Sequence, residues 1–61
     1  MDEPLLISIP GTEARLSVGR TTVYKLIDLG ELVRVNIGRR SFVTADSITR
    51  YVERLSSAAS A

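Results

Sequence analysis

The sequence contains no cysteine and no histidine. Disulfide bridges, zinc sites built from these two side chains, thiol nucleophiles and imidazole acid–base catalysis are therefore excluded. Glycine and proline are also scarce, with four and two residues. A composition of 44% hydrophobic and 25% charged residues is typical of a folded chain rather than a disordered or collagen-like one. Sixty-one residues suffice for a single domain over residues 1–61, but not for two separate cores.

Long hydrophobic runs and clustered carboxylates are missing as well. The apolar start at residues 5–9 is too short to cross a bilayer, and Asp2 and Glu3 before it have the wrong charge for a signal peptide. The seven acidic residues do not gather at metal-ligand spacing, and the four glycines lie far apart rather than in one phosphate-binding loop. We therefore expect a cytoplasmic protein that is not an enzyme, with no metal, cofactor, small-molecule substrate or membrane partner.

The charge is distributed unevenly along the chain. The net charge is only +1, yet residues 15–42 have six basic and two acidic residues, a net charge of +4. The remaining residues have two basic and five acidic side chains, a net charge of −3. A basic central region favours a surface that meets a polyanion, although neutral globular proteins also show such a split.

Two short helices are predicted in the first half of the chain. Apolar residues recur three and four positions apart at Val23, Leu26 and Ile27. This spacing predicts a helix over residues 20–29, with Gly19 at its cap position and Gly30 as a left-handed stop. A weaker helix is expected over residues 9–16, capped by Ser8 and with Leu16 as its buried residue. The tight turn at residues 17–19 would join the two as a helix-turn-helix.

The second half changes to a strand pattern. Apolar residues alternate with polar ones at Val33, Val35 and Ile37, and Phe42 and Val43 follow. The alternation predicts a β-hairpin whose turn is at Gly38, because glycine adopts turn dihedrals without steric cost. Residues 5–8 are a candidate extra strand beside it.

A third helix is expected to follow the hairpin, capped by Thr44 or Asp46. Its apolar stripe consists of Ile48, Tyr51, Val52 and Leu55, and we expect this stripe to face the core rather than a partner helix. The Ser/Ala tail either extends this helix or frays, and residues 1–4 and 56–61 are expected to be flexible. The predicted fold class is mostly α with a small β-hairpin, a winged helix-turn-helix.

The helix predicted over residues 20–29 has side chains suited to the DNA major groove. These are Arg20, Thr21, Thr22, Tyr24 and Lys25. Arginine and lysine pair with guanine edges, threonine contacts thymine or phosphate, and tyrosine reaches phosphate oxygens. The alternative is a solvated helix face, with Tyr24 folded over the edge of the core.

The predicted hairpin tip carries Arg39, Arg40 and Ser41. Neighbouring guanidinium groups repel each other, so we expect this tip to meet a polyanion, along or within the DNA minor groove. The alternative is a solubilising turn whose charges discourage strand-edge aggregation. Arg15 and Arg34 are further candidates for contacts with the DNA backbone.

Three sequence stretches carry a family resemblance. They are residues 17–27 (SVGRTTVYKLI), Gly30-Glu31-Leu32 and Ile37-Gly38-Arg39-Arg40. From Leu5 to Leu55 the chain resembles the excisionase-type winged-helix DNA-binding family, which is related to the MerR DNA-binding fold. The combination is fairly specific, although several kinds of transcription regulator share it. The family usually has two alanines where this sequence has Thr12 and Glu13, so Thr12 or Ala14 is expected to make the close approach in the first helix.

The resemblance implies that residues 20–29 enter the major groove of double-stranded DNA and that the wing tip at Arg39 and Arg40 contacts the minor groove or backbone. Family members from phages and mobile elements are recombination directionality factors. They bind neighbouring repeats beside an attachment site, often side by side, bend the DNA and direct a tyrosine integrase towards excision. The resemblance thus implies an excisionase in a bacterial host, with an integrase and head-to-tail copies of itself as partners.

Two other functions remain open at this point. A transcription regulator or an antitoxin could use the same domain, although MerR-type regulators carry an additional effector or dimerisation region, so the resemblance favours the excisionase. A protein-interaction module could instead present the basic face to an acidic partner.

Overall fold

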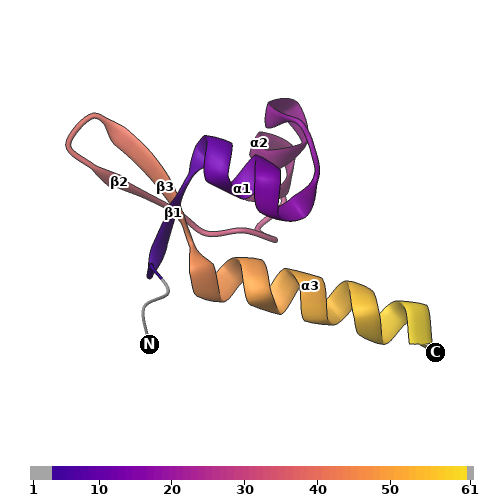
Figure 1. The fold of residues 1–61 in the computed structure, drawn as a ribbon. Coiled ribbons are helices and arrows are strands. Elements are labelled where there is room, and N and C mark those ends of the chain that lie inside the picture. The colour runs from indigo at the N-terminus through magenta and orange to yellow at the C-terminus, as the bar shows by residue number, and fades with distance from the viewer. Residues whose placement is uncertain (1–3, 61) are drawn as a thin grey trace.

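The computed structural model describes residues 4–60, and the side chains of residues 4–58. Its elements are β1 (Leu6–Ser8), α1 (Ile9–Leu16), α2 (Arg20–Asp28), β2 (Arg34–Ile37), β3 (Arg40–Thr44) and α3 (Ala45–Ser60). The strands form one antiparallel sheet in the order β1-β3-β2, and the β2–β3 hairpin projects away from the helices (Figure 1). The predicted fold class, helices with a small sheet and a hairpin wing, is confirmed.

Helix α1 begins and ends as the sequence predicts. The Ser8 hydroxyl accepts a hydrogen bond from the Gly11 N–H at 3.1 Å, which satisfies one of the unpaired donors of the first turn. After Leu16, Ser17 adopts a left-handed conformation with φ of 57°, and the chain turns towards α2. Ser8 as the cap and 9–16 as the bounds are thus both confirmed.

The buried residues of α1 differ from the prediction. Leu16 is only half-buried, whereas Ile9 and Thr12 are buried. These three residues share one face, but Leu16 lies at the end of the helix, where it covers the edge of the core. Thr12, rather than the exposed Ala14, makes the close approach, and its hydroxyl donates to the Ser8 carbonyl at 3.0 Å. A threonine fits this buried position because its hydroxyl has a partner.

Helix α2 is held to the core by its apolar stripe. Val23 is fully buried and Leu26 nearly so, while Ile27 packs from the side. The helix ends at Asp28, one residue before the predicted end, and Gly30 then takes a positive φ of 81° as expected. Gly19 occupies the cap position.

The sheet joins the start of the chain to the wing. Ile7, Val43 and Arg34 lie opposite one another across β1, β3 and β2, and Ile7 and Val43 are both buried. The expected extra strand is therefore confirmed, beginning at Leu6. Because β3 is central, the wing continues from a strand that is anchored on both sides.

Ser47 fixes the base of the wing to α3. Its buried hydroxyl accepts from the Val33 N–H at 3.1 Å and donates to the Thr44 carbonyl at 2.8 Å. The Thr44 hydroxyl in turn accepts from the Ser47 N–H at 3.2 Å, so Thr44 is the cap of α3. Asp46 instead pairs with Arg50 at 3.1 Å on the exposed face of α3.

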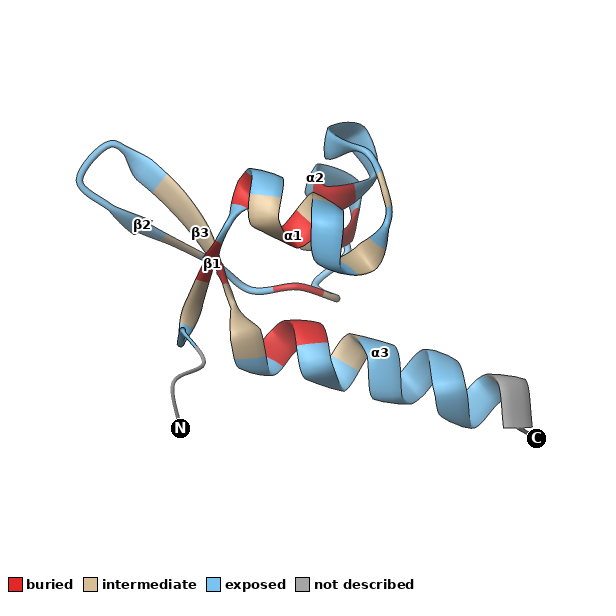
Figure 2. Ribbon diagram, in the orientation of Figure 1, coloured by how far each residue is buried: buried red, intermediate tan, exposed pale blue. Residues whose placement is uncertain are grey.

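The apolar stripe of α3 faces the core only in its first half. Ile48 is buried and Tyr51 half-buried, but Val52 and Leu55 are 43% and 52% exposed. The prediction that this whole stripe is core is wrong for its second half, because α3 continues past the rest of the domain (Figure 2). The Ser/Ala tail extends this helix to Ser60. The expected flexibility of residues 1–3 and 61 falls outside the described residues.

Seven apolar residues from β1, α1, α2, the loop after α2, β3 and α3 make up the core. They are Ile7, Ile9, Val23, Leu26, Leu32, Val43 and Ile48. The core lies where α1, α2, β1, β3 and the start of α3 meet, which leaves β2, the tip of the hairpin and the second half of α3 outside it (Figure 2). The relative positions of α2 and the base of the wing are set by this shared core.

Candidate nucleic-acid interface

Helix α2 presents its polar face to solvent. Burial of Val23 and Leu26 fixes the rotation of the helix about its axis, so the opposite side faces outwards. All the candidate contact residues of this helix are exposed: Arg20, Thr21, Thr22, Tyr24 and Lys25. The major groove of DNA is wide enough for one α-helix, and these side chains can donate hydrogen bonds to the base edges in it.

Arg20 and Tyr24 form a pair one turn apart on α2. The Arg20 guanidinium lies 5.9 Å from the centre of the Tyr24 ring, within the range of a cation–π contact. Tyr24 is 37% exposed, so its ring is neither buried in the core nor fully solvated. The ring therefore limits where the Arg20 side chain extends.

The hairpin formed by β2 and β3, which we call the wing, ends in a two-residue loop. Ile37 pairs with Arg40, so Gly38 and Arg39 alone form the connection. Gly38 has a φ of 60°, and a positive φ at the first loop position is typical of the type II′ turn that glycine favours. Arg39 thus lies at the tip and Arg40 at the first position of β3, as expected for a wing with two arginines at its end.

Ser41 has a structural partner within the wing. Its hydroxyl donates to Asn36 Oδ1 at 2.9 Å, across the two strands. Ser41 is half-buried and Asn36 is exposed. This cross-strand bond supports the register of the hairpin close to its tip.

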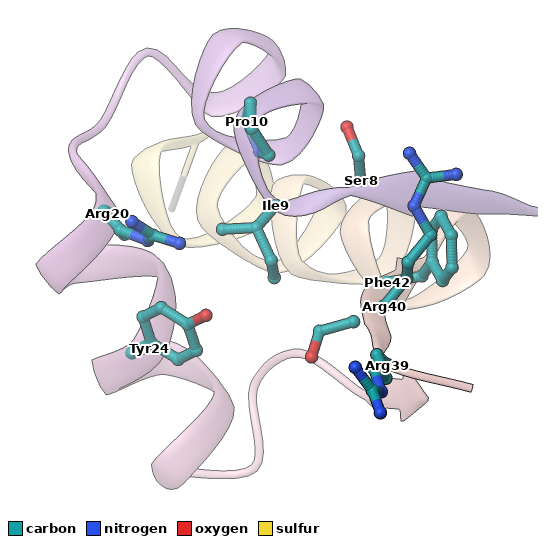
Figure 3. A pocket seen from close by; sticks show the side chains of 9 residues that line it. Ser8, Ile9, Pro10, Arg20, Tyr24, Arg39, Arg40 and Phe42 are labelled. Carbon is teal, nitrogen blue, oxygen red and sulfur yellow. The ribbon is translucent and has the colours of Figure 1, made fainter. Parts of the chain in front are cut away.

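The wing and α2 face each other across an open cleft of about 670 Å³. Arg20 and Tyr24 of α2 lie on one wall, and Arg39 and Arg40 of the wing lie on the other (Figure 3). The remaining lining residues are Ser8, Ile9, Pro10, Ser41 and Phe42. The structure therefore brings together three arginines from segments about twenty positions apart in the sequence.

The cleft arginines have no carboxylate partners among the described residues. Among the described residues, the ion pairs are Arg50 with Asp46 and Arg54 with Glu31, and both involve α3. No carboxylate lines the cleft. The positive charge of Arg20, Arg39 and Arg40 is thus available to an anionic ligand.

Other predicted contact residues are exposed but do not line the cleft. They are Thr21, Thr22, Lys25, Arg15 and Arg34. Conversely, sequence reasoning did not place Ser8, Pro10 or Phe42 at the site. The β1–β3 pairing puts Ser8 opposite Phe42, and this non-local contact has no signal in the sequence beyond the weak strand pattern at residues 5–8.

A family comparison agrees with this geometry. Residues 8–56 match the family model described as "Helix-turn-helix domain". The chain belongs to the helix-turn-helix domain family. Membership indicates a DNA-binding protein rather than a catalyst, with DNA as its partner. The match includes the turn between α1 and α2, the wing and most of α3. A comparison with curated proteins found no match.

Over residues 4–60, no helix has both the length and the hydrophobicity needed to span a bilayer. The same part of the chain has no group of three or more acidic side chains arranged to hold a metal ion.

Proposed function

We propose that this helix-turn-helix protein binds duplex DNA with α2 in the major groove and the wing in or along the adjacent minor groove. The observation that carries this proposal is the cleft, because its two walls hold cations that no described carboxylate neutralises. A sugar–phosphate backbone separates adjacent grooves and is the polyanion that fits between such walls. Arg20 and Lys25 then reach base edges, while Arg39 and Arg40 contact the minor groove or phosphates.

The biological role we propose is that of an excisionase in the cytoplasm of a bacterial host. The support is the resemblance in residues 17–27 and in the two glycine-containing stretches that follow. In this role the protein binds repeats at an attachment site, bends the DNA and directs a tyrosine integrase towards excision. One α2 and one wing cover a small area, so binding of a long site relies on neighbouring copies, which associate head to tail in an open array.

The DNA-binding proposal is tested with a duplex enriched by selection from a randomised pool, and with an unrelated duplex. Arg39→Ala with Arg40→Ala should weaken binding to both duplexes. Arg20→Ala should also reduce the preference for the selected duplex, by about 1–3 kcal/mol for a base contact. Arg50→Ala is the matched control, because this arginine lies on α3 and pairs with Asp46. Failure to enrich any duplex at physiological salt, with binding to an acidic protein instead, would overturn the proposal in favour of a protein-interaction module.

A second experiment separates the excisionase from a regulator or an antitoxin. A reaction with a tyrosine integrase and its attachment-site DNA should give more excision product and less integration product when the protein is added. The wing double variant should lose this effect. If recombination is unchanged but transcription from a promoter that contains the selected site changes, the excisionase role is wrong and the regulator is correct.

A further inference from the structure

Ile37 is a large apolar side chain at the end of the wing. It is the last residue of β2, directly before the Gly38-Arg39 loop, and it is 57% exposed. In the antiparallel register it lies opposite Arg40, and paired residues project from the same face of a sheet. The tip therefore presents a branched hydrocarbon beside a guanidinium group.

The exposure of the apolar residues varies along the wing. Val35, two residues earlier on the same face, is half-buried, whereas Val33 at the base of the wing is 53% exposed, so the alternating apolar residues are covered only in the middle of the wing and are exposed again at its end. β2 is an edge strand of the sheet. Proteins usually place charged or polar residues at such edges, because exposed apolar strands promote aggregation. What distinguishes Ile37 is its place at the end of the projecting wing beside Arg40, where it can reach an apolar surface of a ligand that the arginines bind.

The minor groove of DNA offers such a surface. Its negative potential attracts arginine side chains, while proteins that enter it frequently insert isoleucine or other apolar residues between base pairs. Such insertion partly unstacks one base step and kinks the duplex by about 20–90°. Arg39 and Arg40 would hold the tip in the groove, and Ile37 would point in the same direction as Arg40.

We propose that Ile37 is the apolar wedge by which this protein kinks DNA, at a flexible pyrimidine–purine step beneath the wing tip. The proposal rests on the DNA-binding function above and assigns the deformation of the duplex to one side chain. Arg39 and Arg40 attract the wing tip to the minor groove, and Ile37 unstacks the two base pairs between which it inserts. The cost of unstacking is lowest at TA and CA/TG steps, so the wedge also confers a sequence preference at a position where no hydrogen bond is made.

The test compares Ile37→Thr with Val33→Thr on the selected duplex. Both changes replace an exposed β-branched residue by threonine, which keeps strand propensity, but Val33 lies at the base of the wing next to α3. The bend is measured by energy transfer between dyes at the two duplex ends. Unstacking is measured by the fluorescence of 2-aminopurine placed at successive steps beneath the wing. Ile37→Leu, which keeps a hydrocarbon at the tip, is the conservative variant.

The wild-type protein and Val33→Thr should bend the duplex and raise 2-aminopurine fluorescence at one step. Ile37→Thr should lose most of both signals while its dissociation constant rises less than about tenfold, and Ile37→Leu should retain them. Equal bending by wild type and Ile37→Thr would overturn the wedge. So would a change in the number of copies bound, with the bend unaltered, because Ile37 would then contact a second protein.

The two proposals fail in different ways. If wild type binds no duplex, the DNA-binding function itself is wrong. If wild type binds and bends the selected duplex, the wing arginines are needed for binding, and Ile37→Thr still bends it fully, only the wedge is wrong. Far-ultraviolet circular dichroism of each variant confirms that the fold is retained in every comparison.

Discussion

At the scale of single residues, Gly11 lies where α1 packs closely against the strand before it. A Cβ at this position would lie 2.9 Å from Ile7 Cγ2 and 3.0 Å from Ser8 Oγ. Ile7 belongs to the core and Ser8 caps α1, so movement of either side chain would cost core packing or the capping hydrogen bond. The sequence pattern gives no sign of this crowding, because it depends on how β1 turns into α1.

Gly11→Ala should therefore destabilise the protein by about 1–3 kcal/mol, the usual cost of overpacking. Helix propensity alone predicts the opposite sign, a gain of about 1 kcal/mol. Urea unfolding followed by circular dichroism measures the difference. Gly19→Ser is the control, since a Cβ there meets nothing within 4 Å and a serine cap should add about 0.3 kcal/mol. A Gly11→Ala protein as stable as wild type would contradict the crowding.

Tyr24 should act on DNA binding partly through Arg20. Tyr24→Phe keeps the ring beneath the guanidinium and should retain sequence preference, whereas Tyr24→Ala should lose much of what Arg20→Ala loses. The double variant Arg20→Ala/Tyr24→Ala should then be less impaired than the sum of the single variants, with a coupling of about 0.5–1 kcal/mol. Fluorescence anisotropy with the selected duplex measures this coupling. Strict additivity would show that the two side chains act separately.

At the scale of elements, local signals predicted most of the fold. The caps at Ser8 and Gly19, the glycine at position 30 and the alternation along the hairpin each depend on neighbours within a few residues, and the boundaries predicted for α1 and α2 agree with the structure to within one residue. The pattern failed in α3, where Val52 and Leu55 continue an apolar stripe that the described chain leaves about half exposed. Periodicity shows which face of a helix is apolar, but the extent of its burial depends on the size of the domain beneath it.

Truncations along α3 should therefore have very different effects. Ile48→Ala removes a buried side chain and should cost about 2–5 kcal/mol, enough to unfold much of so small a domain. Leu55→Ala should cost less than about 1 kcal/mol, because its side chain is half exposed already. Thermal unfolding of the two variants gives the comparison. Similar losses would show that the second half of α3 is covered in solution, as it would be in a self-associated protein.

At the scale of the whole molecule, the candidate site depends on tertiary packing. The sequence indicates which side chains are basic and that two separate segments carry them. The two basic segments face each other across one cleft because β3 is central in the sheet, because Ser47 anchors the base of the wing, and because α2 and β3 share one core. Those contacts join residues far apart in the chain, so their geometry was not available from local patterns.

The salt dependence of DNA binding should report the number of cations that meet phosphates. The logarithm of the binding constant should fall linearly with the logarithm of salt concentration, with a slope of about −0.9 for each neutralised phosphate. Arg15→Ala and Arg34→Ala should each reduce the magnitude of the slope by about one if these residues contact the backbone. Arg50→Ala should leave the slope unchanged. Unaltered slopes for Arg15→Ala and Arg34→Ala would remove both residues from the interface.

The most direct measurement is a chemical footprint of α2 and the wing on one duplex. Hydroxyl radicals probe minor-groove sugars, and methylation interference probes guanine N7 in the major groove. The minor-groove protection should lie about half a helical turn, or about 5 base pairs, from the major-groove contact. Arg39→Ala with Arg40→Ala should remove the first signal and retain the second. Two results for a single bound copy would contradict a cleft that holds the backbone between adjacent grooves. One is a major-groove contact with no minor-groove protection beside it, and the other is a separation of a full helical turn or more between the two signals.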